Sequence, residues 1–189
     1  MRAKIALLLL LMAFFVWSED LKVITSKTQY FTYTVPSSWR YTAKETPIAM
    51  EVANFTNDLG AYFMTSSVDM YDRLKTSPGY STYTRSNFSY RNYSPDSINA
   101  ALKGYIESYI GGLTYPNLLV QEKKVSKING EPCLYVRFSF SAGDETVVQE
   151  TFDILYMGVD TKLSYGVMQS KKSMYYPTIL NMINSVKYK

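Results

Sequence analysis

The chain of 189 residues contains no histidine and a single cysteine. The absence of histidine excludes Ser-His-Asp and Cys-His catalytic sets, imidazole zinc ligands and histidine-based pH switches. One cysteine cannot form a disulfide within the chain, and Cys133 has no second thiol that could activate it. In an oxidising compartment we expect it to be a buried, unreactive thiol, with intermolecular pairing as the minority alternative.

A strong charge of either sign is also absent. The sequence has 20 Lys and Arg residues against 16 Asp and Glu residues, a net charge of +4. This excess is too small to indicate a nucleic-acid-binding surface. The sequence has neither a glycine-rich phosphate loop nor the spaced acids, central glycine and closing glutamate of an EF-hand. We therefore expect no cofactor, no metal ion and no nucleic acid partner.

The first residues of the chain predict an export signal, residues 1–18. Two basic residues precede an uninterrupted apolar run from Ile5 to Trp17. The run is shorter than the roughly 20 residues that a membrane-spanning helix needs, so a permanent anchor is the weaker alternative. Val16 and Ser18 are suited to a signal peptidase and place the cleavage before Glu19. We expect an exported protein, in the bacterial periplasm or secreted, with no stable membrane span after cleavage.

The remaining chain, residues 19–189, is long enough to bury one sizeable core, and we expect a single domain. Several segments alternate apolar and polar residues, as half-buried strands do, and Asn129-Gly130 is a hairpin dipeptide between two of them. A tight turn is predicted over residues 158–161. Strands are predicted over residues 21–25, 29–35, 49–55, 60–68, 118–128, 131–141, 146–157 and 163–168.

Two segments have the period of helices. In residues 94–113 apolar side chains recur every three or four positions, and Ser94-Pro95-Asp96 supplies a cap and a first-turn proline. A second helix is predicted near residues 174–186, with Pro177 in its first turn. Strands joined by tight turns, with one helix inserted and one at the end, predict an α+β fold, an antiparallel β-sheet flanked by helices. Rossmann topology is disfavoured because strands do not alternate with helices.

The order of four segments resembles the PsbP-like superfamily of α/β/α sandwiches, in its exported bacterial PsbP- and DcrB-like branch. The segments are YFTYTVPSSW (30–39), the central helix, INGEPCLYVRFSF (128–140) and MINSVKY (182–188). The resemblance implies a packed tryptophan, Trp39, after the first long strand. Members have accessory and binding roles that differ between branches, so we carry over no functional residue.

The segment from residue 71 to residue 94 matches no pattern of that family. It places five tyrosines and one phenylalanine among basic, hydroxyl and amide side chains. Tyrosine rings stack on sugars and arginines bind carboxylates or phosphates, so the composition is typical of a binding loop. The alternative is that the rings pack against the sheet and helix. The candidate binding residues are Tyr80, Tyr83, Arg85, Phe88, Tyr90, Arg91 and Tyr93.

Three functions remain open from the sequence. The leading hypothesis is a non-catalytic, exported accessory or binding protein that contacts an envelope protein. The alternative is a carrier of a small amphipathic or glycan ligand in an aromatic-lined pocket. A large, mostly apolar pocket would favour the carrier, and a flat aromatic patch would favour the protein partner. The residual hypothesis is a hydrolase that uses one of three acid pairs, Asp69 with Asp72, Asp144 with Glu145, or Glu150 with Asp153, although neighbouring acids are usually solvated.

Overall fold

The computed structural model describes residues 20–26, 31–44, 51–56 and 60–189. The predicted export signal lies outside the described residues. Within the described ranges, no helix is long and apolar enough to cross a membrane. The described strands form two sheets in which every pair of neighbours is antiparallel.

The smaller sheet has three strands in the order β1-β2-β10, and the larger has seven in the order β3-β4-β5-β9-β8-β7-β6. The small sheet consists of β1 (Leu21–Thr25), β2 (Phe31–Pro36) and β10 (Lys187–Tyr188). The large sheet consists of β3 (Arg40–Lys44), β4 (Glu51–Thr56), β5 (Ala61–Asp69), β6 (Leu119–Ile128), β7 (Glu131–Ala142), β8 (Glu145–Tyr156) and β9 (Val159–Met168).

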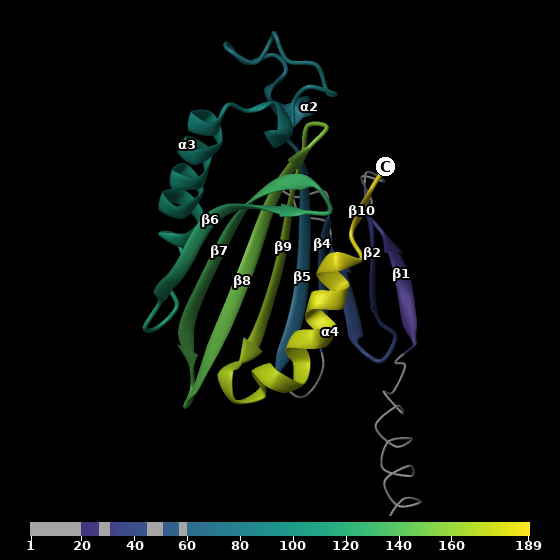
Figure 1. Ribbon diagram of the computed structural model, residues 1–189, viewed down its shortest axis with the longest axis vertical. Coiled ribbons are helices and arrows are strands. Elements are labelled where there is room, and N and C mark those ends of the chain that lie inside the picture. The colour runs from purple at the N-terminus through teal and green to yellow at the C-terminus, as the bar shows by residue number, and fades with distance from the viewer. Residues whose placement is uncertain (1–19, 27–30, 45–50, 57–59) are drawn as a thin grey trace, which may run out of the picture.

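Helices cover the two faces of the large sheet (Figure 1). The described helices are α2 (Met70–Leu74), α3 (Pro95–Tyr105), which continues into a π-helical turn (Ile106–Ile110), and α4 (Lys172–Asn184). Helix α3 packs on β6 and β7, whereas α4 packs on β9 and β2. At the start of α3 the Ser97 amide donates a hydrogen bond to Ser94 Oγ at 3.1 Å, the expected cap. The predicted α+β fold is confirmed.

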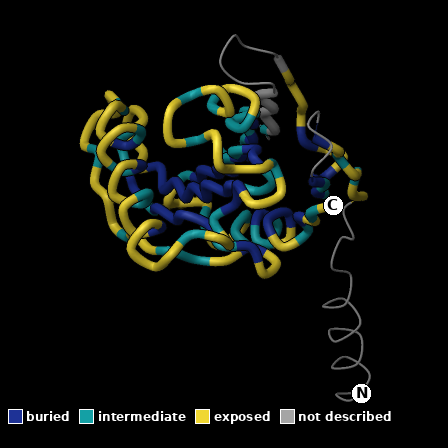
Figure 2. Tube along the Cα trace, turned by 90° about the horizontal axis from the view of Figure 1, so that it is seen from above, coloured by how far each residue is buried: buried dark blue, intermediate teal, exposed yellow. Residues whose placement is uncertain are grey.

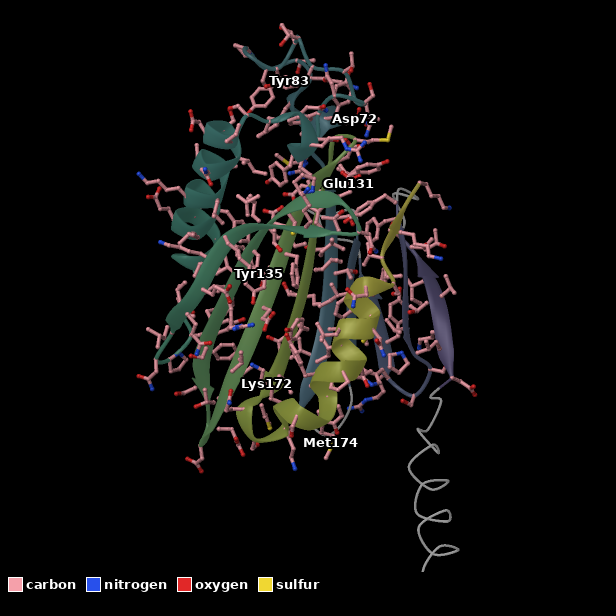
Figure 3. The ribbon with its side chains drawn as sticks, in the orientation of Figure 1. Asp72, Tyr83, Glu131, Tyr135, Lys172 and Met174 are labelled. Carbon is pink, nitrogen blue, oxygen red and sulfur yellow. The ribbon has the colours of Figure 1, made fainter. Side chains whose placement is uncertain are left out.

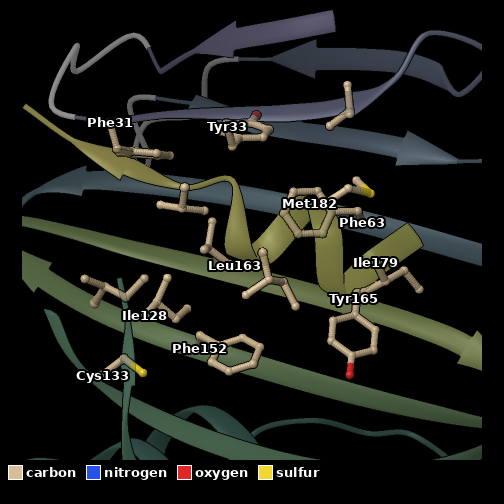
Figure 4. Packing of buried hydrophobic residues seen from close by; sticks show 14 of the residues in the cluster. Phe31, Tyr33, Phe63, Ile128, Cys133, Phe152, Leu163, Tyr165, Ile179 and Met182 are labelled. Atoms are coloured by element: carbon tan, nitrogen blue, oxygen red, sulfur yellow. The ribbon is translucent and has the colours of Figure 1, made fainter. Parts of the chain in front are cut away.

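Two apolar clusters form the core, one on each face of the large sheet. Successive residues of β7 alternate between them, so Cys133 and Tyr135 join the cluster under α4 and Leu134 and Val136 join the cluster under α3. Figure 2 shows this buried interior enclosed by exposed loops and helix surfaces. Figure 4 shows the α4 side, where Cys133 lies among apolar neighbours. Burial raises the pKa of its thiol to about 12, so Cys133 is a thiol at neutral pH.

Several elements differ from the sequence predictions. The turn predicted over residues 158–161 is wrong, because Tyr156 already pairs with Val159 and the turn is only Met157-Gly158, both at positive φ. Pro177 lies inside α4 and not in its first turn, because a 3-10 turn (Gln169–Lys171) leads into a helix that begins at Lys172. Strand β3, helix α2 and strand β10 were not predicted.

The two ends of the large sheet carry different elements. Figure 3 labels Tyr83 at one end, beyond α2, and Met174 near the other end, at the start of α4. The turn between β8 and β9 points to the same end as Tyr83 (Figure 1). This end, which holds residues 71–94, is called the aromatic end below.

Candidate functional site

Segment 71–94 is attached to the turn between β8 and β9 by backbone hydrogen bonds. The Gly158 amide donates to the Phe88 carbonyl at 2.7 Å, and the Tyr71 amide donates to the Gly158 carbonyl at 2.9 Å. The Met157 amide donates to Ser89 Oγ at 2.8 Å. A Cβ on Gly158 would lie 2.4 Å from Tyr71 Cβ, so the close approach requires glycine there. The segment is therefore fixed to the sheet at both its start and its middle.

Three rings of the segment form an aromatic cluster, defined here as Tyr80, Tyr83 and Phe88. The Phe88 ring is 3% exposed, and its centroid lies 5.9 Å from that of Tyr80 and 5.2 Å from that of Tyr83. The two tyrosine rings are 6.1 Å apart, and Tyr83 remains 36% exposed. Phe88 thus anchors two tyrosines that still present surface to solvent.

Tyr90 and Tyr93 form a second ring pair, in an edge-to-face arrangement with centroids 5.4 Å apart. Both pack against the apolar cluster under α3, which includes Ile98. Burial raises the pKa of both phenols. These two rings therefore contribute to the core as well as to the surface of the segment.

Two of the three arginines in the segment, Arg85 and Arg91, are held by acids. Arg85 lies 2.9 Å from Asp69 and 3.1 Å from Asp72, and its guanidinium is 5.0 Å from the centre of the Tyr71 ring. Arg91 forms a two-pronged contact with the buried carboxylate of Glu131, with its Nε donating at 3.1 Å. Arg85 connects the segment to the end of β5 through Asp69, and Arg91 connects it to β7 through Glu131.

Two pockets lined by described residues open at the aromatic end, and Tyr93 lines both. The smaller has a volume of about 400 Å³ and is lined by Tyr80, Tyr83, Asn92, Tyr93, Ser94 and Ser97. The larger, of about 630 Å³, lies between the segment, the start of α3 and β6, and its lining includes Tyr90, Arg91, Tyr93, Ile98, Val125 and Lys127.

The structure therefore brings most of the predicted site residues together. Tyr80, Tyr83 and Tyr93 share the smaller pocket, with Phe88 packed against the first two, and Tyr90 and Arg91 line the larger one. Arg85 lines neither pocket, because its ion pairs hold it beside α2. The binding role of these residues stays a prediction.

The acid pairs considered from the sequence do not form isolated catalytic pairs. Glu150 and Asp153 lie on opposite faces of β8: Glu150 pairs with Arg137 at 2.9 Å, and Asp153 lies under α3. Asp69 and Asp72 both contact Arg85. The remaining pair, Asp144 with Glu145, is exposed at the turn between β7 and β8.

Sequence reasoning missed a charge cluster, defined here as Asp153, Asp160 and Lys162. Asp153 is buried, whereas the side chains of Lys162 and Asp160 are 23% and 20% exposed. Lys162 Nζ lies 3.0 Å from Asp160 Oδ2 and 3.7 Å from Asp153 Oδ2. The signal was present in the sequence, because a two-residue turn at Met157-Gly158 puts these three residues on one face of the hairpin.

No protein-family model and no curated protein matches the sequence. The fold is similar to that of cyanobacterial PsbP from Synechocystis, with a TM-score of 0.59 and 6% identity over 93% of this chain and 96% of that one. It is also similar to a crystal structure from Bacteroides thetaiotaomicron, with a TM-score of 0.55 and 12% identity over 89% of this chain. This chain spans only 48% of the Bacteroides protein. The predicted PsbP-like resemblance is confirmed for the fold, and at these identities for the fold alone.

Proposed function

We propose that this chain is an exported, non-catalytic binding protein of the cell envelope that captures an envelope protein at the aromatic end. The observation that carries the proposal is the aromatic cluster, in which Tyr80 and Tyr83 remain at the surface while contacts with buried Phe88 fix their rings. Rings that are already ordered lose little conformational entropy when a partner binds. Their hydroxyl groups can form hydrogen bonds with polar groups of the partner at the edge of the interface.

The acids and the composition support a non-catalytic role. The sequence has no histidine, and each acid pair considered for hydrolysis is separated, bound by arginine or exposed at a turn. Arg85 and Arg91 fit a positioning role, since each forms ion pairs that connect the segment to the rest of the fold.

Replacing Tyr80 and Tyr83 together with serine tests the proposed surface. We expect capture of the partner, measured by co-purification from the protein's own cells, to fall by more than about tenfold, because a ring at an interface centre contributes about 2 kcal/mol or more. The free energy of unfolding should fall by only about 1 to 2 kcal/mol, from lost ring contacts with Phe88.

Tyr115→Ser is the matched control, because Tyr115 is an exposed tyrosine outside the segment that stacks on Phe140. It should lose ring contacts and keep full capture. Normal capture by the Tyr80→Ser/Tyr83→Ser variant, with the control unchanged, would rule out the aromatic end as the capture surface. Tyr90 is left intact, since its packing under α3 would confuse binding with stability.

Export is tested by the mass of the chain recovered from the cell envelope or the medium. We expect a chain that begins at Glu19, because the basic leader, the short apolar run and Val16 with Ser18 describe a cleavable signal. Intact mass spectrometry measures this directly. Recovery of a chain that keeps Met1 and sediments with membranes would contradict it.

The larger pocket favours a second candidate, a carrier of a small amphipathic or glycan ligand. Its volume of about 630 Å³ lies in the range of small-molecule sites, and it combines apolar surface from Ile98 and Val125 with the basic groups of Arg91 and Lys127. Native mass spectrometry of the chain purified from its own cells should then show a bound small molecule. Val125→Trp should remove it by filling the pocket, and should leave capture of a protein partner unchanged.

A further inference from the structure

A third pocket, of about 450 Å³, lies under the end of α3, away from the aromatic cluster. Its floor is the charge cluster on β8 and β9, where Asp153 is paired in register with Lys162. Tyr105 and Tyr109 also line it, with their rings stacked 5.1 Å apart at an interplanar angle of 14°. The pocket reaches solvent, because Ser108 in its lining is exposed.

The helix that carries these two tyrosines has an unusual ending. After Tyr105 it continues as a single π-helical turn, and the Gly111 amide donates to the Ile106 carbonyl at 2.9 Å. Such turns are rare and occur frequently at functional sites. The turn lies directly at the pocket and holds Tyr109.

Lys162 does not satisfy all of the hydrogen-bonding oxygens that line the pocket. Its ammonium contacts the Oδ2 atoms of Asp160 and Asp153, and lies 5.7 Å and 5.9 Å from the ring centres of Tyr105 and Tyr109. Three buried oxygens remain without a hydrogen-bond partner among the described residues: Asp153 Oδ1, Asp160 Oδ1 and the Tyr105 hydroxyl. Asp153 is 4% exposed and Tyr105 is 7% exposed.

Unpartnered buried oxygens are costly: the two carboxylate oxygens lack a donor, and the Tyr105 hydroxyl, which can accept as well as donate, lacks any partner. The cluster has two carboxylates and one ammonium, so its charge is negative when both acids are ionised. Burial, and then the neighbouring Asp160, raise the pKa of Asp153 although Lys162 opposes the shift. A positive donor in the pocket would relieve both the unpaired oxygens and the repulsion between the acids.

We propose that this pocket binds the protonated amino group of a small organic amine. A primary ammonium group has three N–H donors, and each of the three unpartnered oxygens at this pocket, the Tyr105 hydroxyl included, can accept one of them. Ala101 and Leu134 in the lining offer apolar surface to a short carbon chain. The competing occupant is a single proton shared by the two acids, in which case no amine binds. The proposal is independent of capture at the aromatic end.

The test is a calorimetric titration of the full mature chain with n-butylammonium near neutral pH. We expect saturable binding, and at least about tenfold weaker binding of 1-butanol, which has the same chain and no charge. Tetramethylammonium, a cation without N–H donors, should also bind at least about tenfold more weakly. Absence of butylammonium binding to the folded chain, or equal binding of 1-butanol, would overturn the proposal.

Variants locate the binding. Asp153→Asn removes one carboxylate and should weaken butylammonium binding by about tenfold or more, and Tyr105→Phe keeps the ring and should weaken it several-fold. Asp144→Asn, at an exposed turn, is the matched control and should bind as the parent does. If Asp153→Asn fails to fold, the butylammonium affinity of the Tyr105→Phe variant tests the proposal. Unchanged butylammonium affinity in the folded pocket variants would overturn the proposal. The Tyr80→Ser/Tyr83→Ser variant should bind butylammonium as the parent does, whether or not it captures the partner protein.

Discussion

Replacing Lys162 with methionine should lower the free energy of unfolding by about 3 to 5 kcal/mol near neutral pH. Methionine keeps an unbranched chain of similar length and removes the ammonium that lies 3.0 Å from Asp160 and 3.7 Å from Asp153. Burial lowers the pKa of Lys162, but the two carboxylates outweigh it and the pKa is raised. Without the ammonium, the buried carboxylate of Asp153 and the mostly buried carboxylate of Asp160 would lie together with no positive charge to balance them.

The loss should depend on pH in a defined direction. The pKa of Asp153 is already raised in the folded parent, chiefly by burial and then by Asp160, and removing Lys162 raises it further. A group whose folded pKa is raised stabilises the fold when protonated, and that contribution disappears as pH rises through the folded pKa. The variant should therefore be close to the parent in mildly acidic solution and clearly weaker at neutral pH.

Urea unfolding at the two pH values measures this, with Lys103→Met as the control. Lys103 lies on the exposed side of α3, 3.9 Å from Glu107, and such surface pairs contribute about 0 to 1 kcal/mol. A loss for Lys162→Met that is below about 1 kcal/mol, or that does not change with pH, would show that the cluster is not a balanced set of charges.

Replacing Trp39 with alanine should lower the free energy of unfolding by about 3 to 5 kcal/mol. Trp39 is 4% exposed and lies between β2 and β3, in the cluster under α4. Truncation leaves a cavity as large as an indole ring, which the two flanking strands can fill only partly. This position connects the small sheet to the large one, so the loss should affect the whole cooperative transition.

Circular dichroism is the suitable readout for this variant, since the substitution removes Trp39 fluorescence itself. Val23→Ala, at an exposed position of β1, is the control and should change the unfolding midpoint little. An unchanged midpoint for Trp39→Ala would remove this residue from the set that holds the two sheets together.

Part of the fold could be predicted because some strands have one buried face and one that is less buried. In β2 the buried side chains are Phe31, Tyr33 and Val35, which alternate with partly buried threonines, and β5 shows the same period. Strand β3 could not be predicted in this way, because it is an edge strand whose sequence, RYTAK, has no such alternation. An edge strand forms hydrogen bonds with only one neighbouring strand, and its own sequence contains little information about that pairing.

The candidate site could be predicted only as a segment. Composition identified residues 71–94, but not that Phe88 would be buried while Tyr83 stayed at the surface, since this depends on contacts with the distant turn between β8 and β9. The charge cluster was missed for a related reason. Placing that turn over residues 158–161 shifts the register of β9, and Asp160 then falls in a loop instead of beside Asp153.

The central claim, capture of an envelope protein at the aromatic end, is tested most directly by photo-crosslinking in the protein's own cells. A benzophenone amino acid is placed at position 83, within the aromatic cluster, or at position 174, an exposed position near the opposite end of the sheet (Figure 3). We expect a covalent adduct with one envelope protein from position 83 and none from position 174. An adduct with the same protein from position 174 and none from position 83 would contradict the account.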